Sequence, residues 1–375
     1  MHRENSYRFG FRVAPLLVSA LAGGGLFAAA CGGSTDNALG GSSDGGLVGD
    51  GSNGRRDGAA STSDGGGKDG GAEIVEIGGR NFVARKLYLG DSDRSGVQGS
   101  TAWEAYGANV DGLVTTADST GVCALSVGAT KSTQADGNDG IDNSFGANIV
   151  PIILAVAGSD FATKLNAGIE QGGSTFMLDF TGLTDDPAQT LSPLSAQLFG
   201  GAHFGTPSWT TTDRWSVYKS TLIGGSLATG AKTKFATAAI SSGTWASGSG
   251  GDLPLSVSLG TATLALVIHH AVISFAHSSA NQATLGNVSG VLTTSEFIAA
   301  FRSVAGTLST QLCTGSSFDD IAAQFQAASD IMHDGTNTAA AACDAISIGI
   351  GFDATETAPP DTAIDLPVSP DPCSD

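Results

Sequence analysis

The side chains with the clearest capacity for chemistry lie in one short polar loop, at residues 136–143. The loop reads Asp-Gly-Asn-Asp-Gly-Ile-Asp-Asn, which supplies oxygen ligands at Asp136, Asn138, Asp139, Asp142 and Asn143. Calcium takes six to eight oxygen ligands, from loops in which a glycine permits a sharp turn. We therefore predict that this loop binds Ca²⁺ through these five residues.

The same loop has a second interpretation. Its second half resembles half of a thrombospondin type 3 repeat, but it departs from EF-hand spacing because Gly140 comes one residue early and no glutamate closes the loop. A calcium site would need help from elsewhere, from Asp91, Asp93, Asp111 or Asp118. The alternative is an Asp/Asn/Gly turn whose side chains bind nearby backbone groups.

Cys31 is the second chemically distinctive residue, because it follows a basic start and the apolar run Val13–Ala30. The order Ala-Ala-Ala-Cys resembles the lipobox of bacterial lipoproteins, although Ala28 stands where leucine is usual. The resemblance implies cleavage before Cys31, acylation of its thiol and a membrane anchor, and Gly32 implies the outer membrane. The alternatives are an ordinary secretory signal or a membrane span, for which 18 residues with a glycine triplet are short.

Composition divides the rest of the chain. Residues 32–71 contain 15 Gly and 6 Asp and no aromatic residue, so 31–72 reads as a disordered tether with a reach of roughly 35 Å. We expect one β-rich domain at 73–357 and a disordered Pro/Asp tail at 358–375. Without residues 1–30, the charge is 14 Lys+Arg minus 35 Asp+Glu, or −21, which disfavours nucleic acid and anionic lipid as partners.

The four cysteines after Cys31 predict disulfides, because an even number in an exported protein is typical of them. Three pairings are possible. We favour Cys313–Cys343, which flank one helical region, and then Cys123–Cys373.

Hydrophobic periodicity predicts the fold. Short alternating runs predict strands, for example at 81–89, 174–182 and 346–352, with others at 74–77, 194–199, 215–222, 234–240, 255–259, 263–274 and 285–292. Helical spacing is found at about 147–171 and 295–332. The predicted fold is mainly β, a two-sheet sandwich or jelly roll with a few helices, and α+β is the fallback.

Aromatic and acidic residues in the β region offer two further interpretations. Trp209, Trp215 and Trp245 could stack against a carbohydrate ligand, or they could belong to the core. A glycan hydrolase would need a pair of carboxylates, for which Glu170 and Asp179 are candidates without a distinguishing signal.

Most of residues 80–355 also resembles a group of secreted myxobacterial lipoproteins of unknown activity. The matching runs are residues 103–107 (WEAYG), 109–112 (NVDG), 139–146 (DGIDNSFG) and 346–352 (ISIGIGF). We therefore expect an exported, lipid-anchored envelope protein, non-catalytic, with a structural or ligand-binding role and a carbohydrate or protein ligand. A glycan hydrolase and a calcium-stabilised adhesin are the alternatives.

Overall fold

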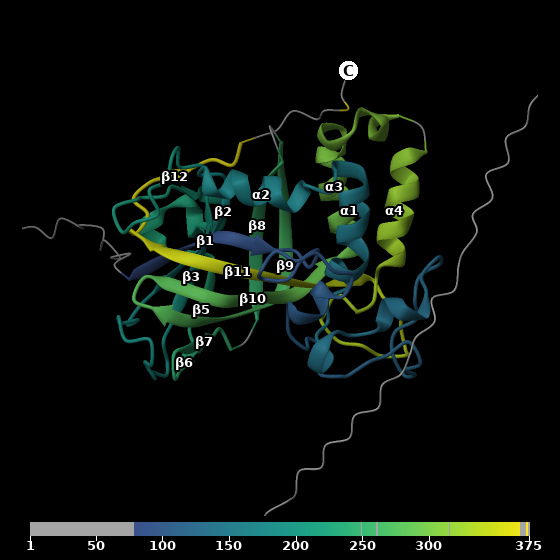
Figure 1. Cartoon of the computed structure of the whole chain (residues 1–375), viewed down its shortest axis with the longest axis horizontal. Coiled ribbons are helices and arrows are strands. Elements are labelled where there is room, and N and C mark those ends of the chain that lie inside the picture. Colours follow the sequence, from purple (N-terminus) through teal and green to yellow (C-terminus); the bar gives the residue numbers. More distant parts are fainter. Residues whose placement is uncertain (1–78, 249, 260–261, 315, 368–372, 374–375) are drawn as a thin grey trace, which may run out of the picture. The chain divides into compact units, whose positions relative to one another are not determined.

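The alternating apolar runs become the strands of one mixed sheet, which is centred on β1 and β11 (Figure 1). The computed structural model describes residues 79–248, 250–259, 262–314, 316–367 and 373. The expectations for residues 1–30 and 31–72, including Cys31, and for a strand at 74–77 lie outside the described residues. The strands are β1 (Arg80–Tyr88), β2 (Thr175–Phe180), β3 (Ala196–Gly201), β4 (Val217–Tyr218), β5 (Thr233–Phe235), β6 (Ala239–Ser241), β7 (Thr244–Ala246), β8 (Gly251–Leu259), β9 (Ala262–Ser279), β10 (Gln282–Thr293), β11 (Ala345–Thr357) and β12 (Ala363–Ile364).

The sheet order is β12-β4-β3-β2-β1-β11-β10-β9-β7-β6, with β5 beside β3 and β8 beside β9. Only the β12–β4 pair is parallel among the paired strands of the described residues. The prediction of a mainly β fold is confirmed. The finer prediction of a two-sheet sandwich is not confirmed, because hydrogen bonds connect these strands into a single sheet.

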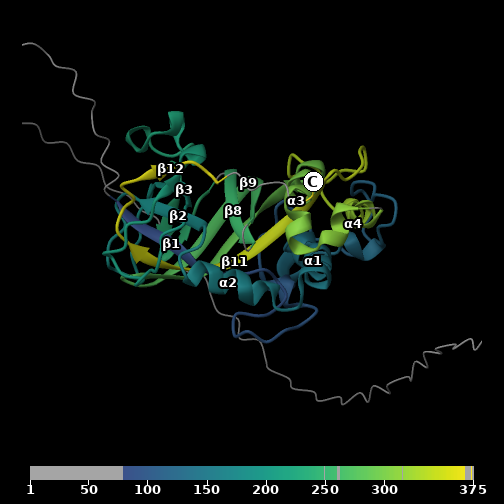
Figure 2. The ribbon, with the colours of Figure 1, turned by 90° about the horizontal axis from the view of Figure 1, so that it is seen from above.

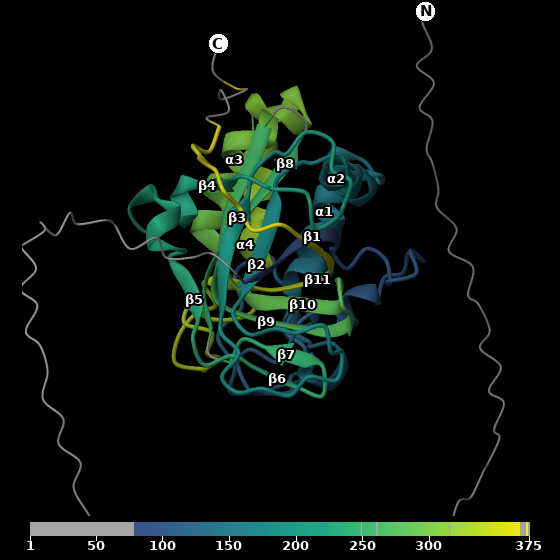
Figure 3. The ribbon, with the colours of Figure 1, turned by 90° about the vertical axis from the view of Figure 1, so that its left-hand side faces the viewer.

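The long strand β9 bends and carries the sheet around a corner. Its first half pairs with β8 and its second half with β10. The bend falls at His270, whose φ of +53° lies in the left-handed region. Gly250 and Gly290 permit the bend, because a Cβ on either would lie 2.6 Å from the backbone of His270 or His269. As a result β8 crosses the direction of β10 and β7 (Figure 3).

Helices lie in both predicted regions. They are α1 (Val150–Ala157), α2 (Phe161–Glu170), α3 (Thr294–Leu308) and α4 (Ser317–Ala327). Figure 2 shows α1, α3 and α4 together at one end of the sheet, whereas α2 lies beside β1. Phe297, Phe301 and Phe325 join α3 to α4, with ring centroids 4.9 and 5.0 Å apart across the two helices.

No single helix among the described residues is long and apolar enough to cross a bilayer. The segments Phe145–Ala157 and Phe161–Glu170 meet the length and composition requirement only as a pair, bent by 86°.

Both faces of the β1–β3 region are buried. On one face Phe82, Phe180, Trp245 and Phe275 form an aromatic cluster within the main core. On the other face a smaller core contains Val83, Met177, Phe199, Trp215, Val217, Leu222 and Ala231. This double burial explains why all six residues of β2 are buried.

The expectation of a disordered tail is wrong for residues 358–367. The backbone N–H of Ala358 donates to Asp213, and that of Val217 donates to Thr362. β12 then pairs with β4 at the sheet edge, a position that tolerates nearby prolines such as Pro359 and Pro360.

The predicted disulfide pairing is also wrong, because the bonds are Cys123–Cys343 and Cys313–Cys373. The backbone of Asp344 binds Thr294 at the start of α3, whereas Cys313 follows the end of that helix. A helix of 15 residues is roughly 22 Å long, far beyond the Cα separation that a disulfide spans. Cys343 instead lies beside Cys123, whose neighbour Ala124 pairs with Ala342.

Candidate functional site

Two irregularities in the sheet flank Asp353 of β11 and lie beside a groove with a polar lining. The register of β1 shifts between Ala84 and Lys86, and that of β10 shifts between Ala283 and Gly286. Both shifts fall opposite residues 352–354 of β11. A bulge bends its strand and redirects side chains. Arg85 and Lys86 therefore line the same groove, although consecutive residues of a regular strand face opposite sides.

The groove runs between the sheet and α2 and has a volume of about 400 Å³. Four elements supply its lining: Arg85 and Lys86 from β1, Asn166, Ala167 and Glu170 from α2, Gln282 from β10, and Asp353 and Thr355 from β11. A second hollow of about 290 Å³ adjoins it and shares Lys86 and Asn166. Asp91 and Asp93 line this second hollow.

Asn166 fixes α2 against β1. The β1–β2 pairing extends only from Arg80 to Val83, so the rest of the β1 edge needs other partners. The Asn166 amide accepts the N–H of Leu87 at 2.7 Å and donates to its carbonyl at 2.8 Å. Asn166 is therefore part of the framework of the groove.

Arg85 and Glu170 form one wall of the groove. The Arg85 Nε donates to Glu170 Oε2 at 2.9 Å, and this hydrogen bond is the main cause of the raised pKa of Arg85. The guanidinium also lies 5.0 Å from the ring centre of Trp209. Trp209 donates from its indole to the backbone of Glu170 at 3.3 Å. It is half-buried and supports this ion pair.

Asp353 is the centre of the opposite wall. It accepts a hydrogen bond of 2.6 Å from the Tyr88 hydroxyl and lies 3.4 Å from Arg94. Burial raises the pKa of Tyr88, and the hydrogen bond to Asp353 raises it further. The Lys86 ammonium lies 4.6 Å from the centre of the Tyr88 ring. Within the described residues, no carboxylate forms an ion pair with Lys86.

The groove brings together two carboxylates, Glu170 and Asp353, that a glycoside hydrolase would have to use as acid and base. Each carboxylate already forms an ion pair with an arginine, Glu170 with Arg85 and Asp353 with Arg94. Asp179, the other sequence candidate, does not line the groove. It is 2% exposed on β2, and burial raises its pKa to about 6. The groove has the features of a binding site.

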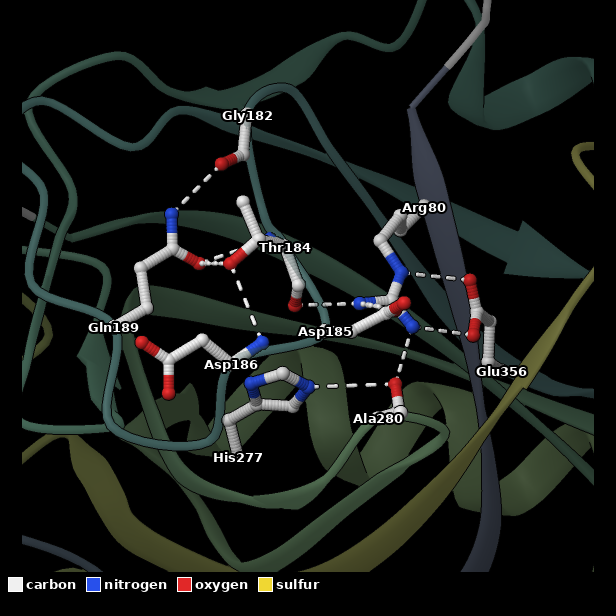
Figure 4. Close-up of polar contacts among 9 residues, drawn as sticks. All are labelled: Arg80, Gly182, Thr184, Asp185, Asp186, Gln189, His277, Ala280 and Glu356. Carbon is white, nitrogen blue, oxygen red and sulfur yellow. Dashed lines mark hydrogen bonds and ion pairs between the residues drawn. The ribbon is translucent and has the colours of Figure 1, made fainter.

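A second polar cluster lies at the other end of β1 and differs in kind (Figure 4). Arg80 donates to Glu356 from two nitrogens, with Nε–Oε1 at 2.8 Å. It also donates to the carbonyls of Thr184 and Ala280 and pairs with Asp185 at 3.0 Å. His277 contacts the same Ala280 carbonyl at 3.4 Å. The Arg80 guanidinium is thus fully used within the protein.

The structure brings only part of the predicted calcium loop together. Asp136 and Asp142 are in hydrogen-bonding contact, close to Asp111. The Asp142 carboxylate is 4% exposed and accepts the N–H of Val110 at 2.6 Å. Its pKa is raised to about 8, first by burial and then by the charge of Asp111. Asp136 binds Thr115, and burial raises its pKa.

The contacts of the other predicted ligands indicate that the loop has a structural role. Asn143 is buried, donates to the carbonyls of Trp103 and Tyr106, and accepts from the N–H groups of Gly146 and Gly349. Asn138 and Asp139 are exposed. Within the described residues, no group of three or more His, Cys, Asp or Glu is arranged to hold a metal ion. Calcium binding stays a prediction.

The tryptophan prediction is wrong for two of its three residues. Trp215 and Trp245 are completely buried, each in a different core: Trp245 lies on β7 and Trp215 just before β4. Trp209 alone lies beside the groove.

Sequence reasoning missed Arg85, Lys86, Gln282 and Asp353 as site residues. Two consecutive charged residues inside the apolar strand 81–89 were a usable signal of a bulge. Gln282 and Asp353 offered no comparable signal, because the strand register alone brings them to the groove. Comparisons with known proteins found no matching family model, no matching curated protein and no matching solved structure.

Proposed function

We propose that this chain is an exported, lipid-anchored envelope protein whose folded region is a non-catalytic ligand-binding module. The groove between β1, β10, β11 and α2 is the observation that carries the binding role. It is concave, it falls within the size range of small-molecule sites, and its polar groups come from four separate elements.

Two disulfides support export. They join cysteines that are 220 and 60 residues apart in sequence. Such bonds form and persist in oxidising compartments outside the cytoplasm. They use four of the five cysteines, so Cys31 is the cysteine that remains for acylation. By resemblance to the lipobox pattern, Gly32 favours the outer membrane.

A substitution at Cys31 tests the anchor. Cells expressing the native chain, Cys31→Ala or the control Ser34→Ala are labelled with an alkyne fatty acid and fractionated with detergent. We expect label and membrane association for the native chain and the control, and neither for Cys31→Ala. An unlabelled native chain, or one released into the medium, would contradict the proposal.

A further inference from the structure

We propose that the groove binds an uncharged oligosaccharide, an inference that rests on the proposed binding role of this site. The first support is electrostatic. The charged lining of the main groove is Arg85 and Lys86 against Glu170 and Asp353, two positive and two negative charges that sum to zero, and the adjoining hollow adds the carboxylates of Asp91 and Asp93. Each carboxylate forms an ion pair with an arginine. The chain as a whole carries −19, which opposes an anionic ligand.

The second support is the unused hydrogen-bonding capacity of the lining. Lys86 has three ammonium donors and, among the described residues, forms no ion pair. Gln282 accepts from Thr355 at 3.3 Å through its oxygen, which leaves its amide N–H groups as donors. Each bound carboxylate has more acceptor sites than its arginine uses.

The lining of one cavity therefore offers both hydrogen-bond donors and acceptors. A hydroxyl group both donates and accepts, so a ligand rich in hydroxyls can satisfy Lys86 and Gln282 while it donates to Glu170 and Asp353. A simple anion would be opposed by the two carboxylates, and a simple cation by Lys86 and Arg85. This complementarity identifies an uncharged saccharide as the ligand class.

The third support is shape. The groove of about 400 Å³ continues past Lys86 and Asn166 into the hollow of about 290 Å³. Together the two adjoining cavities lie within the size range of known ligand sites. Two adjoining cavities can each hold part of an oligomer. Lys86, which belongs to both cavities, is placed to contact adjacent sugar units.

The test is calorimetry on the purified full chain in detergent. The probes are cellotetraose, maltotetraose and chitotetraose, which are uncharged, and tetragalacturonate, an anion of the same length. We expect at least one uncharged probe to bind with a Kd of about 1 mM or lower. Tetragalacturonate should bind more weakly. Lys86→Gln and Gln282→Ala should each weaken binding about tenfold, whereas Lys234→Gln, at an exposed lysine of β5, should not.

Tighter binding of tetragalacturonate would overturn the saccharide class while leaving the binding role standing. If Lys234→Gln weakens binding as much as Lys86→Gln does, binding does not depend on the groove and the proposed site is overturned. If none of the probes binds at about 10 mM, the inference fails. Acylation of Cys31 is read in a separate assay, so a missing anchor and a missing ligand are distinguishable. Thermal melting of each variant verifies that it is folded.

Discussion

The two ends of strand β1 use the same kind of side chain in opposite ways. Arg80, at the start of the strand, is 16% exposed and binds Glu356, Asp185 and two backbone carbonyls. Arg85 and Lys86, at the bulge, are more exposed, and Lys86 forms no ion pair within the described residues. The Arg80 cluster has no hydrogen-bonding groups left for a ligand. The cluster at Arg85 and Lys86 retains such groups.

This contrast separates a structural ion pair from a binding surface. A buried charge is tolerated only when its partners satisfy it, so removing a partner leaves a desolvated charge. An exposed pair loses little when one partner is removed, because water replaces it. Substitutions along β1 should therefore affect stability at one end and ligand binding at the other.

The largest effect is expected from Arg80→Met. It leaves Glu356, which is 12% exposed, without its cation, and we expect the free energy of unfolding to fall by about 3–5 kcal/mol. Urea denaturation of the full chain measures this. Arg214→Met is the matched control, since Arg214 is 57% exposed and lies 3.9 Å from Asp361, and it should change stability by less than about 1 kcal/mol.

The double variant Arg80→Met with Glu356→Leu identifies the cause. Removing both charges should recover part of the loss, because no buried carboxylate then remains unpaired. If the double variant is no more stable than Arg80→Met, the hydrogen bonds from Arg80 to the carbonyls of Thr184 and Ala280 are the more important contribution.

A smaller effect, of opposite sign, is expected from Asp179→Asn. Burial raises the pKa of Asp179 from 3.8 to about 6, so the folded state holds its proton more tightly than the unfolded state does. The native chain should then lose stability as the pH rises from about 4 to about 6. The difference of about two pKa units corresponds to roughly 3 kcal/mol.

The asparagine variant lacks this ionisation. We therefore expect it to match the native chain near pH 4 and to be more stable by about 2–3 kcal/mol at pH 7. Denaturation at four pH values measures the difference. Asp118→Asn, at an exposed position, should leave the profile unchanged. Equal stability of native chain and Asp179→Asn at pH 7 would show that Asp179 finds a compensating partner.

Sequence periodicity located most elements, because strands such as 174–182 and 346–352 alternate clearly and the helices have distinct apolar faces. Periodicity failed where contacts between distant segments determine where a strand ends, bends or pairs. Residues 234–240 form two strands, β5 and β6, with different partners, and β9 bends at His270. Residues 358–367 are ordered by pairing with β4, which their own composition does not encode.

The site was less predictable than the fold for a physical reason. Lys86 and Asp353 are opposite each other only through the β1–β11 register, across a bulge. The calcium prediction instead rested on one local run of oxygen ligands. Local runs also form turns, and the loop turns Asn143 inward to bind four backbone groups.

The smallest effect on stability, and the sharpest test of the contrast, is expected from Glu170→Gln. The Arg85 and Glu170 side chains are 41% and 47% exposed, so the pair contributes only about 0.2–1 kcal/mol, and less at high salt. Urea denaturation at low and high salt should detect little change, and Glu296→Gln, at another exposed glutamate, provides the reference. Calorimetry with the uncharged tetrasaccharides should nevertheless detect weaker binding. If Glu170→Gln costs more than about 2 kcal/mol of stability, this end of β1 is structural like the other, and the distinction between the two ends fails.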